Sequence, residues 1–170
     1  YNVSEPAAIG QSGVKYGWCS YCNQYAEAEI PAAMTPTLSP SVYTYNGKAK
    51  KPTVTIKNSE GNKISTSHYS VTYATGRKYV GKYKVTVKFK NQYAGTETLY
   101  FTIIPKAPTS LKATLTAYNA MKVSWSKASG AKGYRVYYKT ADDEEYVLLG
   151  STTSSYYNVK GLEEGTEYQY

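Results

Sequence analysis

The sequence predicts an all-β protein made of two tandem β-sandwich modules, with a small β-hairpin segment at its N-terminal end. Three observations carry this prediction. The 170 residues include 21 Tyr but only 2 Phe and 2 Trp, and Tyr suits the half-buried, pleated surface of a strand. Apolar and polar residues alternate over short stretches, as they do along strands with one buried face. Gly and Asn recur between these stretches, where hairpin turns need them.

Residues 1–35 predict the hairpin segment, and its most informative feature is the pair Cys19 and Cys22. These cysteines could form a disulfide across a tight turn or remain structural thiols. They could also supply half of a zinc site, whose further ligands would have to lie outside this sequence. A redox pair is the third alternative, although no βαβ context surrounds it. No other cofactor is indicated.

Residues 36–105 predict the first sandwich. Its clearest strand is Lys82–Lys90, in which Tyr83, Val85, Val87 and Phe89 fall on one face and the lysines on the other. Further strands are expected at Val42–Tyr45, ahead of the turn dipeptide Asn46-Gly47, and at Thr53–Ile56, Tyr69–Tyr73 and Leu99–Ile103. Several short strands separated by Gly and Asn indicate a sandwich.

Residues 106–170 predict the second sandwich. The linker Pro105–Pro108 precedes it, and its two prolines stiffen the junction and withhold backbone donors. The first strand is expected at Leu111–Leu115. Later strands are expected at Met121–Trp125, Tyr134–Tyr138, Tyr146–Leu149 and Tyr157–Leu162.

Residues 107–170 resemble a fibronectin type III domain. The motifs that carry the resemblance are Pro108 with Leu111, Trp125 on the second strand, Gly133–Tyr138 on the third, Gly161–Leu162, and the corner Gly165–Tyr168. The resemblance implies that the Trp and the strand tyrosines belong to the core and that the corner Tyr holds its turn. It also implies a module that is incomplete at its C-terminus, so we expect a segment of a longer polypeptide.

Residues 36–105 are similar to the bacterial immunoglobulin-like repeats of large surface proteins from Gram-positive gut bacteria. The matching motifs are Tyr43–Lys48, Lys51–Val54, Tyr69–Tyr73, Val80–Val85 and Tyr93–Thr96 ahead of Phe101–Ile103. Residues 1–35 resemble a short Cys-containing repeat of the same kind of protein, through Tyr16–Cys22 and Ile30–Ala32. Such repeats usually carry a further upstream Cys, which this sequence lacks. These resemblances imply a secreted protein at the cell surface or in the cell wall.

The net charge of +8 is concentrated in residues 36–105, which hold ten Lys and one Arg against two Glu. Lys82, Lys84, Lys88 and Lys90 are expected along about 25 Å of one strand face. Such a row could bind a polyanion such as teichoic acid or another sugar phosphate. The alternative is that these lysines only solvate the strand and discourage edge pairing. Nucleic acid is not expected, because no stacking platform accompanies the charge.

Outward tyrosines are a second candidate binding feature. Tyr79, Tyr137 and Tyr156 could stack on sugars, or they could be exposed simply because a Tyr-rich sandwich exposes a few. The acidic run Asp142–Glu145 predicts a solvated loop, since it lacks the framework of a calcium site. His68 has no recognisable nucleophile partner. We therefore predict no catalytic residue and no enzyme activity.

These patterns predict a non-catalytic segment of a modular cell-surface protein that serves as spacer and as adhesion or interaction modules. Its partners would be cell-wall polymers, glycans or host surface proteins, besides flanking domains of the same polypeptide. A second interpretation is a set of accessory modules of an extracellular hydrolase, a glycoside hydrolase or protease, whose catalytic domain lies elsewhere. A third is a weak carbohydrate-binding module. No apolar run approaches the roughly 20 residues of a membrane helix, so membrane insertion is not expected.

Overall fold

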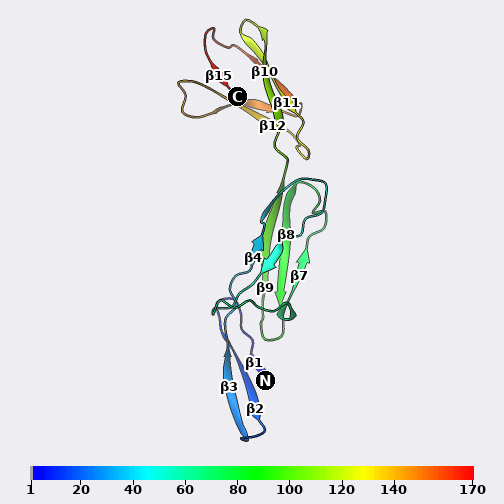
Figure 1. Ribbon diagram of the computed structural model, residues 1–170, viewed down its shortest axis with the longest axis vertical. Helices are drawn as coiled ribbons and strands as arrows, with labels where there is room; N and C mark the ends of the chain where they lie inside the picture. Colours follow the sequence, from blue (N-terminus) through cyan, green and yellow to red (C-terminus); the bar gives the residue numbers. More distant parts are fainter. Residues whose placement is uncertain (1) are drawn as a thin grey trace. The chain divides into compact units, whose positions relative to one another are not determined.

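The computed structural model describes residues 2–170, in which every regular element except one 3₁₀ turn is a β-strand (Figure 1). The chain divides into two compact units, Tyr1–Tyr43 with Gly47–Ile103 and Thr44–Asn46 with Ile104–Tyr170. The all-β prediction with tandem modules is confirmed. The described residues include no helix that is long and apolar enough for a membrane span.

The regular elements fall into two sets along the chain. The first set comprises β1 (Asn2–Glu5), β2 (Gly13–Cys19), β3 (Gln24–Ile30), β4 (Thr37–Ser39), β5 (Val42–Thr44), β6 (Thr53–Thr55), the 3₁₀ turn η1 (Thr66–His68), β7 (Tyr69–Tyr73), β8 (Gly81–Phe89) and β9 (Thr96–Ile104). The second set comprises β10 (Thr109–Ala117), β11 (Ala120–Ser126), β12 (Tyr134–Thr140), β13 (Val147–Thr152), β14 (Tyr156–Lys160) and β15 (Tyr168–Gln169).

The N-terminal strands β1, β2 and β3 form a small antiparallel sheet, in which β2 and β3 are the predicted hairpin. Asn23 closes its turn with a φ of 54°, and the Asn23 N–H donates to the Cys19 carbonyl at 2.8 Å. Gly13 lies so close to the backbone of residues 5–7 that a Cβ there would overlap it. The strand β1 was not predicted from the sequence.

The base of this sheet belongs to the same compact unit as the sandwich that follows. Ala7 and Ala33 are completely buried, and Ile30 is 1% exposed. The Ala7 N–H donates to the Gln92 carbonyl at 2.9 Å, and the Ala7 carbonyl accepts from the Ala94 N–H at 2.8 Å. The structure therefore does not separate residues 1–35 from residues 36–105, because side chains and backbone bonds from both fill their junction.

The sandwich of the first unit consists of the pair β4-β6 and a four-stranded sheet in the order β5-β9-β8-β7. Along β8 the side chains of Val85, Val87 and Phe89 are buried, and the lysines between them are exposed. The buried ring of Phe101 on β9 lies 5.5 Å from the Tyr83 ring, measured between centroids. The predicted two-residue alternation of this strand is confirmed.

The second unit is a sandwich of the sheets β10-β11-β14 and β13-β12-β15. Its core contains Val123, Trp125, Val136 and Val159. The Trp125 ring meets the Tyr134 ring edge-on, with 5.1 Å between the centroids. Trp125 therefore occupies a core position, as the sequence predicted, and the partly buried Tyr134 and Tyr157 pack against that core.

Tyrosine hydroxyls tie the second unit's loops to its strands. The Tyr134 hydroxyl accepts from the Ala128 N–H at 2.8 Å, and the Tyr168 hydroxyl accepts from the Glu163 N–H at 3.0 Å. The latter bond closes the corner between β14 and β15. The predicted role of the corner tyrosine matches this geometry.

The first strand of the second unit, β10, forms where the sequence predicted a strand, and it is exposed. It forms over Thr109–Ala117, but all of its residues are exposed, including Leu111 at 58% and Leu115 at 63%. Among the described residues, β10 pairs with β11 alone, and an open groove lined by Leu111, Trp125 and Tyr170 lies beside it. The apolar residues of β10 are exposed because, among the described residues, no strand covers this side of it.

Truncating Trp125 tests the core of the second unit. We expect Trp125→Ala to lower the free energy of unfolding by about 3–5 kcal/mol, because it removes a buried indole and leaves a cavity. Thermal unfolding of the 170-residue chain, followed by circular dichroism, measures the loss. Tyr137→Ser is the matched control, since this ring is 39% exposed. A comparable loss in both variants would contradict the assigned core.

Candidate functional site

The outer side of the four-stranded sheet carries a row of exposed lysines. Lys82, Lys84 and Lys88 are exposed on β8, which lies between β7 and β9. Lys90 is also exposed, but it follows the end of β8, and its N–H donates to the His68 carbonyl at 2.9 Å. Three of the four predicted lysines therefore share the sheet face, and Lys90 lies beyond it.

The neighbours of these lysines are uncharged. In the β8–β9 register, Lys82 pairs with Thr102, Lys84 with Tyr100 and Lys88 with Thr96. The single acidic residue of β7, β8 and β9 is Glu97, which pairs with buried Val87 and so lies on the inner side. No carboxylate from these three strands therefore offsets the ammonium groups on the outer side.

Tyr100 adds an aromatic ring to the same surface. Its side chain is 50% exposed, and the Lys82 Nζ atom lies 4.6 Å from the ring centroid. Sequence alternation placed Tyr100 on the polar side of its strand, but its position between two lysines depends on the pairing of β8 with β9. We call this surface the lysine face, defined by Lys82, Lys84, Lys88 and Tyr100 with Thr86 and Thr98 between them.

The three tyrosines predicted as a sugar platform do not share a surface. Tyr137 is on β12 and Tyr156 on β14, which belong to different sheets. Tyr79 lies in the first unit, between β7 and β8, and is 56% exposed. The Lys122 Nζ atom lies 4.4 Å from the Tyr156 ring centroid, so this ring already contacts a cation. Each tyrosine remains a separate candidate.

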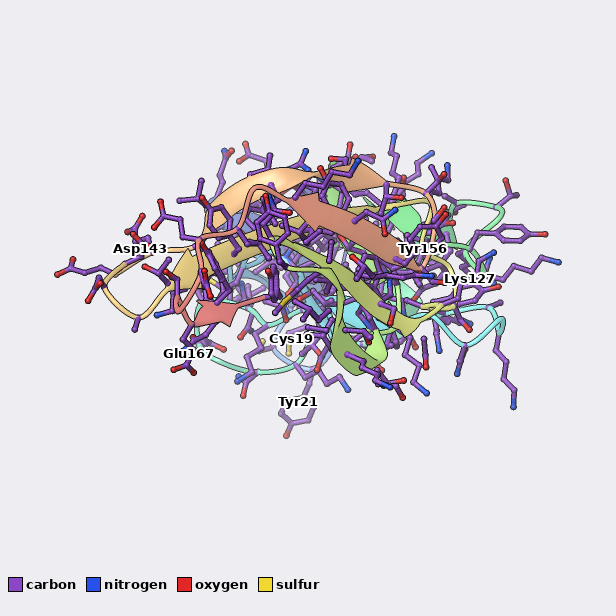
Figure 2. The ribbon with its side chains drawn as sticks, turned by 90° about the horizontal axis from the view of Figure 1, so that it is seen from above. Cys19, Tyr21, Lys127, Asp143, Tyr156 and Glu167 are labelled. Atoms are coloured by element: carbon purple, nitrogen blue, oxygen red, sulfur yellow. The ribbon has the colours of Figure 1, made fainter. Side chains whose placement is uncertain are left out.

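Cys19 ends β2 and Cys22 lies within the turn that leads to β3, and both are free thiols. The Cys22 N–H points at the Cys19 Sγ atom, at 3.3 Å. Hydrogen bonds from the Cys22 side chain, then from the Cys22 and Tyr21 backbone, lower the pKa of the Cys19 thiol. Figure 2 shows Tyr21 extending away from the ribbon beside Cys19. Residues 2–170 hold no group of three or more His, Cys, Asp or Glu arranged for a metal.

The same hairpin carries aromatic residues that the sequence analysis did not single out. The Trp18 and Tyr25 rings lie edge-to-face at 4.6 Å between centroids, and Tyr16 lies 6.1 Å from Tyr25. Trp18 and Tyr25 are paired across the strands, and both are more than half exposed. Such cross-strand pairs stabilise a thin sheet that has little core. The sequence signal that could have predicted this pair is the position of Trp18 and Tyr25 on either side of the turn that contains Cys22.

The remaining polar candidates have structural roles. The Asp143 carboxylate accepts hydrogen bonds from the Thr140 N–H and Oγ1, both at 2.8 Å, so it caps its own loop. In Figure 2 this loop projects into the solvent. The His68 ring lies edge-on to Tyr93 at 5.7 Å between centroids. Neither arrangement assembles a nucleophile with a base.

Comparison with known proteins identifies the C-terminal part of the chain. Residues 106–170 match the fibronectin type III domain family. This segment is a fibronectin type III domain. No match was found among curated proteins.

Two solved structures illustrate the similarity at low identity. Titin domains A168–A170 share 16% identity and a TM-score of 0.37, with 86% of this chain and 63% of the titin chain covered. The FN1–FN3 domains of chicken CNTN1 share 15% identity and a TM-score of 0.33, with coverages of 94% and 70%. The chain therefore spans less than two thirds of the titin structure.

The thiol of Cys19 is expected to react as a thiolate at lower pH than an ordinary cysteine, because hydrogen bonds favour its charged form. The pH dependence of alkylation by iodoacetamide, measured for each thiol in the presence of reductant, reports this pKa. Cys22→Ala should raise it, since the largest cause is lost. Alkylation without reductant, run in parallel, shows whether the pair is oxidised. An unchanged profile in Cys22→Ala would contradict the assignment.

The carboxyl group of Asp143 in the fibronectin type III domain should titrate below the ordinary range for Asp. The Thr140 backbone N–H and then the Thr140 hydroxyl lower its pKa by binding the charged form. The stabilisation of the loop is therefore present above the unfolded pKa and lost as the pH falls through the lower, folded value. NMR titration of the chain should show the Asp143 pKa rising in Thr140→Val. An equal pKa in both proteins would refute this.

Proposed function

We propose that this chain is a non-catalytic segment of a secreted, modular cell-surface protein, in which it acts as spacer and interaction modules. The observation that carries the proposal is a fibronectin type III domain joined to a second all-β unit with its own core. Secretion from a Gram-positive bacterium and an adhesive role belong to this proposal. They are supported by the repeat-like motifs of residues 1–105.

Each unit has hydrogen bonds that tie its loops to its strands, which supports a role as a folded spacer. In the first unit the Tyr73 hydroxyl donates to the Pro52 carbonyl at 2.8 Å. In the fibronectin type III domain the Tyr157 hydroxyl donates to the Leu149 carbonyl at 3.2 Å. These bonds join segments that strand pairing alone does not connect, so each sandwich resists opening at its loops.

The connection between the units also supports a spacer. Residues 105–108 contain two prolines and no regular strand, and β9 ends immediately before them. Proline fixes φ and removes a backbone donor, so a sheet does not propagate through such a segment.

Serial modules also suit an adhesive surface protein. Once one module is bound, the effective concentration of the next is high, so several weak contacts give strong retention.

Surface display of the native protein is the direct test. An antibody raised against the 170-residue chain should label intact source cells, and brief trypsin treatment of those cells should remove the label. A cytosolic marker protein that trypsin leaves untouched is the control for intact cells. Labelling that appears only after lysis would overturn the proposal.

A further inference from the structure

We propose that the lysine face docks a linear polymer of sugars or polyols joined by phosphodiester groups. The inference rests on the proposed function, because it names the partner of an interaction module outside the cell. Its components are the three ammonium groups on β8, the Tyr100 ring and the intervening threonine hydroxyls.

The charge on this face is not compensated within its own sheet. Lys82, Lys84 and Lys88 are all exposed, and their partners on β7 and β9 are Ser, Thr and Tyr. Glu97 is the one carboxylate of these strands and lies on the inner side. Uncompensated cations of one sign attract a polyanion, and each contact releases counterions from it.

The position of β8 argues against the alternative that these lysines only prevent edge pairing and solvate the strand. Lysine on an edge strand prevents pairing with another chain. However, β8 has β7 on one side and β9 on the other, so both of its edges are already occupied. Threonine and serine on the neighbouring strands already make this face polar. Solvation alone therefore does not require a row of ammonium groups.

The geometry favours phosphodiesters over carboxylates. The Cα atoms of Lys82 and Lys84 are about 7 Å apart, and those of Lys84 and Lys88 are about 13 Å apart, by the rise per residue of a strand. The strands β7, β8 and β9 contain no Arg, so the face offers point charges rather than the planar fork that suits a carboxylate. A row of point charges fits single phosphates repeated along a polymer.

The uncharged groups fit the links between the phosphates. Thr86 and Thr98 pair with each other in the middle of the face and offer hydroxyl groups to sugar or polyol hydroxyls. Tyr100 offers a half-exposed ring on which an apolar sugar face can pack. It is the one aromatic residue at an outward position of β7, β8 and β9, whereas single-stranded nucleic acid needs several stacking rings.

The test compares two charge-matched double variants of the 170-residue chain. Lys84→Gln with Lys88→Gln removes two charges from the lysine face. Lys57→Gln with Lys63→Gln removes two exposed charges from a bridge elsewhere in the same unit. Unfolding temperatures of both variants should match the wild type, because all four side chains are exposed.

Binding is measured by calorimetry with purified glycerol-phosphate polymer at several salt concentrations. We expect about a tenfold or greater loss of affinity for the lysine-face variant and little change for the control. The dependence of log K on log salt should become shallower by about two for the lysine-face variant. Neutral dextran should not bind.

Three results would overturn the proposal. They are no binding to glycerol-phosphate polymer at low salt, an equal loss in both double variants, and tighter binding to polygalacturonate or to an oligothymidylate than to glycerol-phosphate polymer. Because purified components are used, these results do not depend on where the protein resides. Antibody labelling that appears only after cell lysis would instead overturn the proposed function, and it would not affect the binding result.

Discussion

The two-residue alternation of β8 is the constraint on which the first unit depends. Val85 and Val87 are completely buried at the centre of the sheet, with lysines on either side of them in sequence. A register slip of one residue would turn those ammonium groups into the core, where an unpaired charge costs several kcal/mol. Burial of these valines therefore fixes the strand register. This register in turn determines which side chains share the lysine face.

Tyrosine is the side chain that links cores to loops throughout the chain. In the first unit the Tyr83 ring stacks on Phe101, and its single O–H shares its hydrogen bond between the Gly76 and Tyr79 carbonyls, at 2.9 and 2.8 Å. In the second unit Tyr134 contacts Trp125 and accepts from a loop N–H. Phe supplies the same apolar area without the bond. At these positions a Tyr therefore does more than a Phe could, because its ring packs and its hydroxyl bonds a loop.

The N-terminal hairpin shows how a thin sheet is held without a core of its own. Its base is built from small side chains, Ala7, Ala32 and Ala33, which let its backbone approach the sandwich closely. The Ser59 N–H donates to the Ala32 carbonyl at 2.8 Å across this junction. Farther out, the contact of Trp18 with Tyr25 holds the strands together up to the cysteine turn. The two thiols therefore lie at a turn whose backbone N–H groups point at the Cys19 sulfur.

By itself, the sequence determined the properties that repeat every two residues or that depend on one turn. These include the all-β fold, the buried and exposed sides of β8 and the apolar face that Trp125 shares with Val123. The corner at Tyr168 was implied by the resemblance to fibronectin type III domains. Periodicity is local, so it can be recognised without knowing which strands are neighbours.

Only the tertiary structure decided which segments meet. It set Tyr100 opposite Lys84, divided Tyr137 and Tyr156 between two sheets, and joined Ala7 to Gln92. It also left the apolar side of β10 exposed. These outcomes depend on strand order and register, which arise from contacts between residues far apart in the chain.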